Sequence, residues 1–229
     1  MLSIIIPMLN EQTTIVQTLF ALQPMRQHDI EIIVVDGASD DRSLQLATPL
    51  CDLAIVAARG RASQMNAGAR VATGTTLLFL HSDTLLPDAA AELIDAELIR
   101  TARSWGRFDV QIDSPTPILR LIAFSMNLRS RLTSIATGDQ AIFVQRSAFE
   151  QVGGFPNIAL MEDIALSKSL KRLSPPICIR AKVKTSARRW IKNGVLRTIL
   201  LMWRLRLAYF LGGDPTWLSK TYADARQND

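Results

Sequence analysis

The chain has 229 residues, of which 48% are hydrophobic and 21% charged, with a mean hydropathy of +0.15. This composition excludes a disordered chain, and the length suits one α/β domain with a sizeable core. Cys51 and Cys178 lie far apart and match no metal-ligand spacing, which excludes a disulfide scaffold and favours a reducing compartment. We expect no secretory signal at the N-terminus and no membrane-spanning helix.

The net charge of +5 is unevenly distributed along the chain. Residues 1–163 hold 12 basic and 18 acidic side chains, whereas residues 164–213 hold 12 basic side chains and no acidic one. A basic block of this kind indicates nucleic acid, an anionic membrane surface or a phosphate-bearing ligand, or else a solvated face without a partner.

Apolar runs alternate with helical periodicity through the first hundred residues. Strands are predicted at 2–7, 30–35, 52–58 and 75–80, and helices at 13–22, 42–50, 61–72 and 87–103, the last opened by Pro87. The run at 30–35 (IEIIVV) is typical of a central parallel strand that is buried on both faces. This alternation predicts a doubly wound α/β sheet.

The second half of the chain is less regular. Strands are predicted at 106–113, 140–145 and 177–183, and helices at 118–132, 164–173 and 194–212, with a loop at 153–156. No composition shift marks an internal linker.

Ligands of doubly wound sheets collect at the carboxyl ends of the strands. The polar side chains predicted there are Asn10, Glu11, Asp36, Arg59, Arg61, His81 and Asp83. A carboxylate such as Asp83 can hold Mg²⁺ or Mn²⁺ against a diphosphate, and Asp163 can serve as a general base toward a hydroxyl. Each also has a structural interpretation, since Asp83 suits a turn and Asp163 suits the positive end of a helix dipole.

Several common signatures are absent from the sequence. No Gly-x-Gly-x-x-Gly or Gly-Lys-Ser/Thr loop follows a predicted strand, and no Gly-x-Ser-x-Gly elbow is present. These absences argue against a dinucleotide dehydrogenase, a P-loop enzyme and a serine hydrolase.

Taken in order, the motifs resemble those of the family-2 glycosyltransferases with the GT-A fold, and in particular a bacterial subgroup of small, single-domain members. The matching segments are SIIIPMLNE (3–11), VVDGASDD (34–41), LFLHSDTLLP (78–87), GDQAIFV (138–144), GGF (153–155), MEDIALSKSL (161–170) and TSARRWIKNGVLRT (185–198). The resemblance implies a single GT-A domain with a mostly parallel sheet. It also implies an inverting enzyme that uses a nucleotide-sugar donor, with a UDP-sugar as the leading candidate.

The resemblance also implies roles for individual residues. The nucleotide sugar would contact Pro7, Asn10, Glu11, Asp36, Arg61, Asp83, Arg188 and Arg189. Asp163 would be the catalytic base, and Asp139, Glu162 and Trp190 would lie toward the acceptor. A divalent cation, Mn²⁺ or Mg²⁺, would bind Asp83, either with His81 as a second ligand or without it.

Two departures from the family pattern leave choices open. The usual Asp-x-Asp metal motif here is His81-Ser82-Asp83. Gly37 stands where many relatives carry a second acid, so UDP is not fixed as the nucleotide.

We expect residues 1–185 to form the GT-A domain and residues 186–229 to form a basic, Trp-containing helical extension packed on it. The helix predicted at 194–212 has Arg197 and Arg204 on one face, and it either lies on an anionic membrane or packs on the core. The segment 118–132 has the same character, and both would suit a lipid or other apolar acceptor. The expected location is the cytoplasm, including the inner face of the membrane.

Three alternative functions fit the sequence less well. A nucleotidyltransferase usually carries a Gly-rich basic loop after its first strand, which PMLNEQTT lacks. A non-catalytic nucleotide- or membrane-binding module derived from a transferase would not need both Asp83 and Asp163. A nucleic-acid-binding role lacks a recognition motif, so no nucleic-acid partner is expected.

Overall fold

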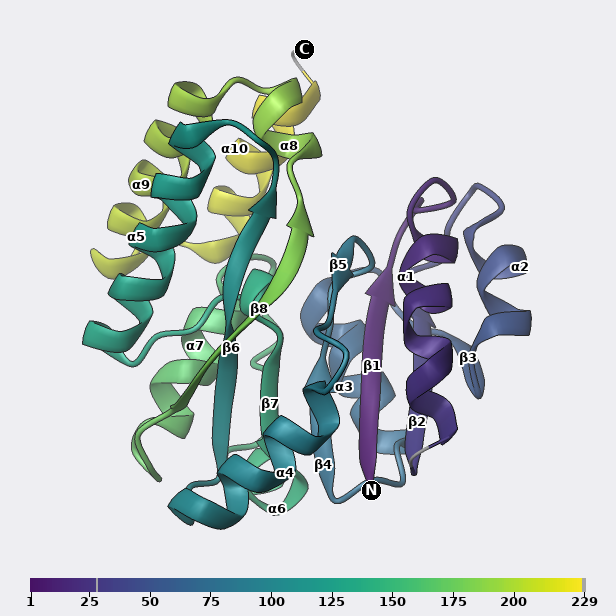
Figure 1. The fold of residues 1–229 in the computed structure, drawn as a ribbon. Coiled ribbons are helices and arrows are strands. Elements are labelled where there is room, and N and C mark those ends of the chain that lie inside the picture. The colour runs from purple at the N-terminus through teal and green to yellow at the C-terminus, as the bar shows by residue number, and fades with distance from the viewer. Residues whose placement is uncertain (28, 228–229) are drawn as a thin grey trace.

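Within residues 1–27 and 29–227, which the computed structural model describes, an eight-stranded mixed sheet carries helices on both faces (Figure 1). The strand order is β3-β2-β1-β4-β7-β6-β8-β5. The strands are β1 (Leu2–Met8), β2 (Ile30–Asp36), β3 (Leu53–Val56), β4 (Thr76–Phe79), β5 (Thr84–Leu85), β6 (Trp105–Asp113), β7 (Ile142–Gln145) and β8 (Ile177–Ser186). The α-helices are α1 (Ile15–Leu22), α2 (Ser43–Ala47), α3 (Arg61–Val71), α4 (Ala90–Thr101), α5 (Pro117–Thr133), α6 (Arg146–Gln151), α7 (Glu162–Leu170), α8 (Arg188–Lys192), α9 (Val195–Phe210) and α10 (Pro215–Gln227).

The α/β class predicted from the sequence is confirmed. Strands β1 to β4 pair in parallel, and β2 is apolar and buried on both faces as expected. Beyond β4 the sheet turns mixed, because β7 pairs antiparallel with both β4 and β6 while β6 and β8 are parallel. Successive side chains of a strand point to opposite faces of the sheet, so the hydrophobic core forms two layers. Ile4 and Val34 lie in the layer on one face, and Ile5 and Val35 in the layer on the other.

Several element boundaries differ from the predictions. The predicted strand 52–58 covers only Leu53–Val56, since it is a partly exposed edge strand. The predicted helix 87–103 begins at Ala90. Pro87 lies before it in a turn, where the Pro87 carbonyl accepts a hydrogen bond from the Ala90 amide. Short elements without a hydrophobic period were missed, namely β5, α6 and α8.

A buried charge network fixes α5 on β6. Arg107 is fully buried, forms an ion pair with Asp109, and donates from Nε to Ser130 Oγ at 3.1 Å. Asp109 also accepts from Arg131 at 2.7 Å. The side-chain amide of Asn127 accepts from the Val110 N–H and donates to the Val110 carbonyl, next to a bulge in β6. These contacts set the position of α5, which lies beside α9 in Figure 1.

The C-terminal helices pack on α7 through a small apolar cluster. Leu205 of α9 and Leu218 of α10 are buried there with Met161 and Ile164. Among the described residues, no helix is both long and apolar enough to cross a membrane. The division into a domain at 1–185 and an extension at 186–229 stays a prediction.

The Arg107 network predicts a large effect of one substitution. Arg107→Met should lower the free energy of unfolding by about 2–5 kcal/mol, because it removes one cation from a buried carboxylate. The control Arg120→Met, at an exposed position on α5, should change it by less than about 0.5 kcal/mol. Urea unfolding measures both, and equal effects would contradict this account of the α5–β6 contact.

Candidate active site

A cavity of about 610 Å³ opens where β1 and β4 end, beside α3 and α8. It brings together most of the residues predicted to bind the nucleotide sugar. Those that line it are Pro7, Asn10, Glu11, Arg61, Asp83, Arg188 and Arg189, together with His81.

Asp36 is the predicted nucleotide-binding residue that does not line this cavity. Its side chain is buried, with 2% of the residue exposed. The carboxylate accepts from the Ser39 amide at 2.8 Å and from the Ser39 hydroxyl. Asp36 therefore closes the turn after β2, and its contact with a base or ribose stays a prediction.

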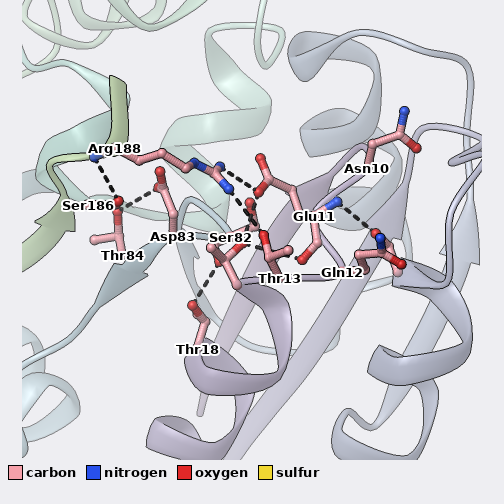
Figure 2. A network of polar contacts seen from close by, with 12 residues as sticks. Asn10, Glu11, Gln12, Thr13, Thr18, Ser82, Asp83, Thr84, Ser186 and Arg188 are labelled. Carbon is pink, nitrogen blue, oxygen red and sulfur yellow. Dashed lines mark hydrogen bonds and ion pairs between the residues drawn. The ribbon is translucent and has the colours of Figure 1, made fainter. Parts of the chain in front are cut away.

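An ion pair joins the loop after β1 to α8 at the wall of the cavity (Figure 2). Arg188 Nη2 donates to Glu11 Oε2 at 2.8 Å, and Nη1 donates to Thr13 Oγ1 at 3.3 Å. The hydrogen bond with Glu11 raises the pKa of Arg188. The first-strand loop and α8 are thereby held together, although they lie 177 residues apart in the sequence.

Asp83 lies in a turn after β4 that is held by hydrogen bonds from other elements. The Thr18 hydroxyl donates to the Ser82 carbonyl at 2.8 Å, and the Asp83 carbonyl accepts from the Ser186 amide at 3.1 Å (Figure 2). These contacts fix the backbone while Asp83 borders two cavities, the one described above and an apolar one between α5 and α9.

His81 and Asp139 face each other at the centre of the site. His81 Nδ1 lies 3.3 Å from Asp139 Oδ1. Burial acts to raise the pKa of Asp139, but the hydrogen bond from His81 and the nearby cations Arg189 and Arg61 hold it well below its usual range. The carboxylate of Asp139 is therefore ionised at neutral pH.

Gly138 connects this pair to the predicted base. Its amide donates to Asp163 Oδ2 at 2.9 Å. A Cβ at Gly138 would lie 2.3 Å from His81 Nε2, so the imidazole packs against the bare glycine.

Asp163 lies in the first turn of α7, which starts after Met161 in the left-handed conformation (φ 69°). Its other carboxylate oxygen accepts from the Ile164 amide at 2.7 Å. Burial raises the pKa of Asp163 above its ordinary value and does the same for its neighbour Glu162. A carboxylate of raised basicity beside a cavity suits proton abstraction from a hydroxyl.

The second large cavity, of about 500 Å³, lies between α5 and α9 and reaches Asp83 and Asp139. Trp190 lines it, and its place toward an acceptor stays a prediction. Arg189 borders both large cavities and the small pocket in which Asp163 and Glu162 lie. The polar cavity at the ends of β1 and β4, the apolar cavity between α5 and α9, and the pocket of the predicted base therefore meet at Arg189.

Asp83 is the side chain at this site that suits a divalent cation. Within the described residues, no group of three or more His, Cys, Asp or Glu side chains could hold a metal ion. His81 has one ring nitrogen facing Asp139 and the other packed against Gly138, and its role as a second metal ligand stays a prediction. One carboxylate supplemented by ligand phosphates is a common way to bind Mg²⁺, and Asp83 fits that pattern.

Sequence reasoning missed some functional candidates. Gln64 is buried below the cavity and donates to the Met8 and Val35 carbonyls, both at 2.8 Å. Arg129 and Arg206 line the apolar cavity. A single Gln or Arg on an amphipathic helix carries no sequence signal for such a position.

The contact at Gly138 yields a test of the site's geometry. Gly138→Ala should lower the free energy of unfolding by about 1–3 kcal/mol, because the new Cβ displaces the imidazole. In a His81→Ala background the same change should have a smaller effect, which urea unfolding of the four proteins measures. Additive effects would show that the ring does not rest on this glycine.

The chain is also similar in sequence to known proteins. The sequence model of glycosyl transferase family 2 matches residues 3–153. Curated relatives named "PGL/p-HBAD biosynthesis glycosyltransferase", from Mycobacterium bovis (strain BCG / Pasteur 1173P2) and Mycobacterium tuberculosis (strain ATCC 25177 / H37Ra), are 36% identical over 96 residues. That match covers 39% of this chain and 38% of each relative, so it spans under two fifths of their length.

Solved structures share the fold at low sequence identity. S. aureus TarS in complex with UDP-GlcNAc has a TM-score of 0.66 and 18% identity, covering 81% of this chain and 58% of that one. The mannosyltransferase PcManGT from Pyrobaculum calidifontis, in complex with GDP-Man and Mn²⁺, has a TM-score of 0.64 and 22% identity, covering 90% and 60%. These likenesses confirm the predicted GT-A type of fold.

Proposed function

This chain belongs to glycosyl transferase family 2, and from that premise we propose that it transfers a sugar from a nucleoside-diphosphate donor to an acceptor hydroxyl with inversion. The observation that supports this proposal is the junction at Arg189. There a polar cavity with Asp83, a carboxylate of raised pKa at Asp163 and an apolar cavity come together.

The donor would occupy the polar cavity at the ends of β1 and β4. Arg188 and Arg189, at the start of α8, would bind the diphosphate, because guanidinium groups match phosphate oxygens in charge and geometry. A divalent cation held by Asp83 and the diphosphate would supply charge neutralisation for the leaving group. Relatives in the fold comparison are complexes with UDP-GlcNAc or with GDP-Man and Mn²⁺, which leaves the nucleotide to experiment.

The transfer itself would be a single displacement. Asp163 takes the proton of the acceptor hydroxyl as its oxygen bonds to the anomeric carbon, and the bond from that carbon to the diphosphate breaks on the opposite face. The electron pair leaves with the nucleoside diphosphate, whose new charge lies beside Arg188 and Arg189. The Gly138 amide holds Asp163 in place by its hydrogen bond to Oδ2.

The acceptor would enter through the apolar cavity between α5 and α9. The outer faces of both helices expose large apolar side chains, among them Phe124 on α5 and Trp203 on α9. Such a surface, next to the basic block, supports contact with an anionic membrane and a lipid or other apolar acceptor.

A donor screen by calorimetry tests the proposal. UDP, GDP, CDP and dTDP are each titrated with and without Mn²⁺. We expect one diphosphate to bind in a metal-dependent way, with at least a tenfold loss in Asp83→Ala, and no loss in Asp113→Asn at an exposed site. If none of the four binds, the alternative of a non-catalytic module gains support.

Asp163→Asn tests the assignment of the base. The rate of transfer, followed with the donor that binds and water as the acceptor, should fall about 10²–10⁴-fold, while the affinity for the diphosphate stays unchanged. The thermal midpoint at pH 7 should not fall. A carboxyl whose pKa is raised in the folded state opposes folding once ionised, so its neutral replacement removes that penalty.

The same pKa shift sets the pH dependence. Since only the carboxylate acts as a base, the rate should drop as the pH falls through an apparent pKa above the ordinary aspartate value of about 3.9. An acid limb at or below that value, or near-full activity of Asp163→Asn, would show that another group is the base.

A further inference from the structure

Two arginines stand at the inner part of the apolar cavity without hydrogen-bond partners for part of their guanidinium groups. Arg129 comes from α5 and Arg206 from α9, and both line the cavity. In the described part of the chain, Nε and Nη2 of Arg129 and Nε of Arg206 are buried and donate to no partner. The arrangement is unusual, because buried guanidinium nitrogens are nearly always hydrogen-bonded.

The neighbouring carboxylates do not satisfy these groups. Asp163 accepts from the amides of Gly138 and Ile164, and Asp139 pairs with His81. Burial lowers the pKa of Arg129, and the charges of Asp163 and Asp139 oppose this shift only through space. Arg107, by contrast, is fully buried and bonds Asp109, Ser130 and the Asn127 carbonyl.

The walls around the two arginines are apolar. Side chains from α5 and α9 that line the cavity are Ile118, Leu121, Ile122, Met126, Ile199, Met202 and Trp203. Leu121 and Trp203 are 62% and 68% exposed, so the apolar lining continues onto the outer surface of the two helices. A ligand matching both features has an anionic group at its inner end and an apolar body that extends outward.

We propose that this cavity binds an amphipathic acceptor whose phosphate or carboxylate group is held by Arg129 and Arg206 and whose apolar chain lies between α5 and α9. The anion supplies the hydrogen-bond acceptors that the two guanidinium groups lack, and the desolvated surroundings strengthen the contact. That the bound molecule is the acceptor rests on the proposed function. The binding site itself rests only on the cavity and its two arginines.

Octyl phosphate, below its critical micelle concentration, is the probe for this site. Calorimetry compares it with inorganic phosphate and with octyl glucoside, which carry only the anion or only the chain. We expect octyl phosphate to bind at least tenfold more tightly than either. Octanoate in a parallel titration distinguishes a carboxylate from a phosphate as the preferred head group.

Arg129→Gln and Arg206→Gln should each weaken octyl phosphate at least tenfold and leave octyl glucoside unchanged. The matched control is Arg204→Gln, an exposed position on α9, which should bind like the unaltered protein. A purely structural role predicts lower thermal midpoints for the first two variants. We expect their midpoints to be unchanged or higher, since a buried charge without full pairing is removed.

The outcomes separate this inference from the proposed function. Equal binding of octyl phosphate and octyl glucoside, or undiminished binding by both arginine variants, would overturn the anion site. Binding of inorganic phosphate as tight as that of octyl phosphate would overturn the amphipathic ligand. The nucleotide titrations on the same samples report on the donor alone, so octyl phosphate binding without nucleotide binding would count against the transferase and leave the site standing.

Discussion

The active-site geometry depends on the absence of a side chain at Gly138. The His81 ring occupies the space where a Cβ would be, and from there its Nδ1 reaches Asp139. The amide of the same glycine fixes Asp163. One residue thus sets the distance between an acid held ionised by its partners and an acid whose pKa burial raises. Neighbouring carboxylates whose pKa values are shifted in opposite directions can take different roles, one in positioning and one in proton transfer.

The change of strand direction after β4 brings the later segments to the site. The parallel half of the sheet delivers Glu11 and Asp83 to one edge, as the strand-end rule requires. The antiparallel pairing of β7 with β4 then places residues 138–140 beside that edge, and β8 leads directly into α8. The Arg188–Glu11 ion pair closes the arrangement, so the last part of the chain completes a site begun by the first.

Much of this could be predicted, because the signals were local. Strongly apolar strands such as β2 and the order of the motifs indicated the fold and most residues that line the polar cavity. What could not be predicted depends on tertiary contacts. Asp36, at the end of β2, resembles Asp83 in the sequence, but its carboxylate accepts hydrogen bonds from Ser39 and does not line the cavity. Arg107 and Arg129 look alike in the sequence, yet one completes a buried network and the other is left partly unpaired.

The acidic and the basic parts of the chain meet at the site. The acidic first part places Asp83, Asp139 and Asp163 around one junction, and burial there raises the pKa of Asp163. The basic segment after residue 163 supplies Arg188, Arg189 and Arg206 to the same junction. The cations offset the carboxylates on the side of the polar cavity. In the apolar cavity, N–H groups of Arg129 and Arg206 lack hydrogen-bond acceptors from the described part of the chain. These unpaired donors favour an anionic ligand there over a neutral one.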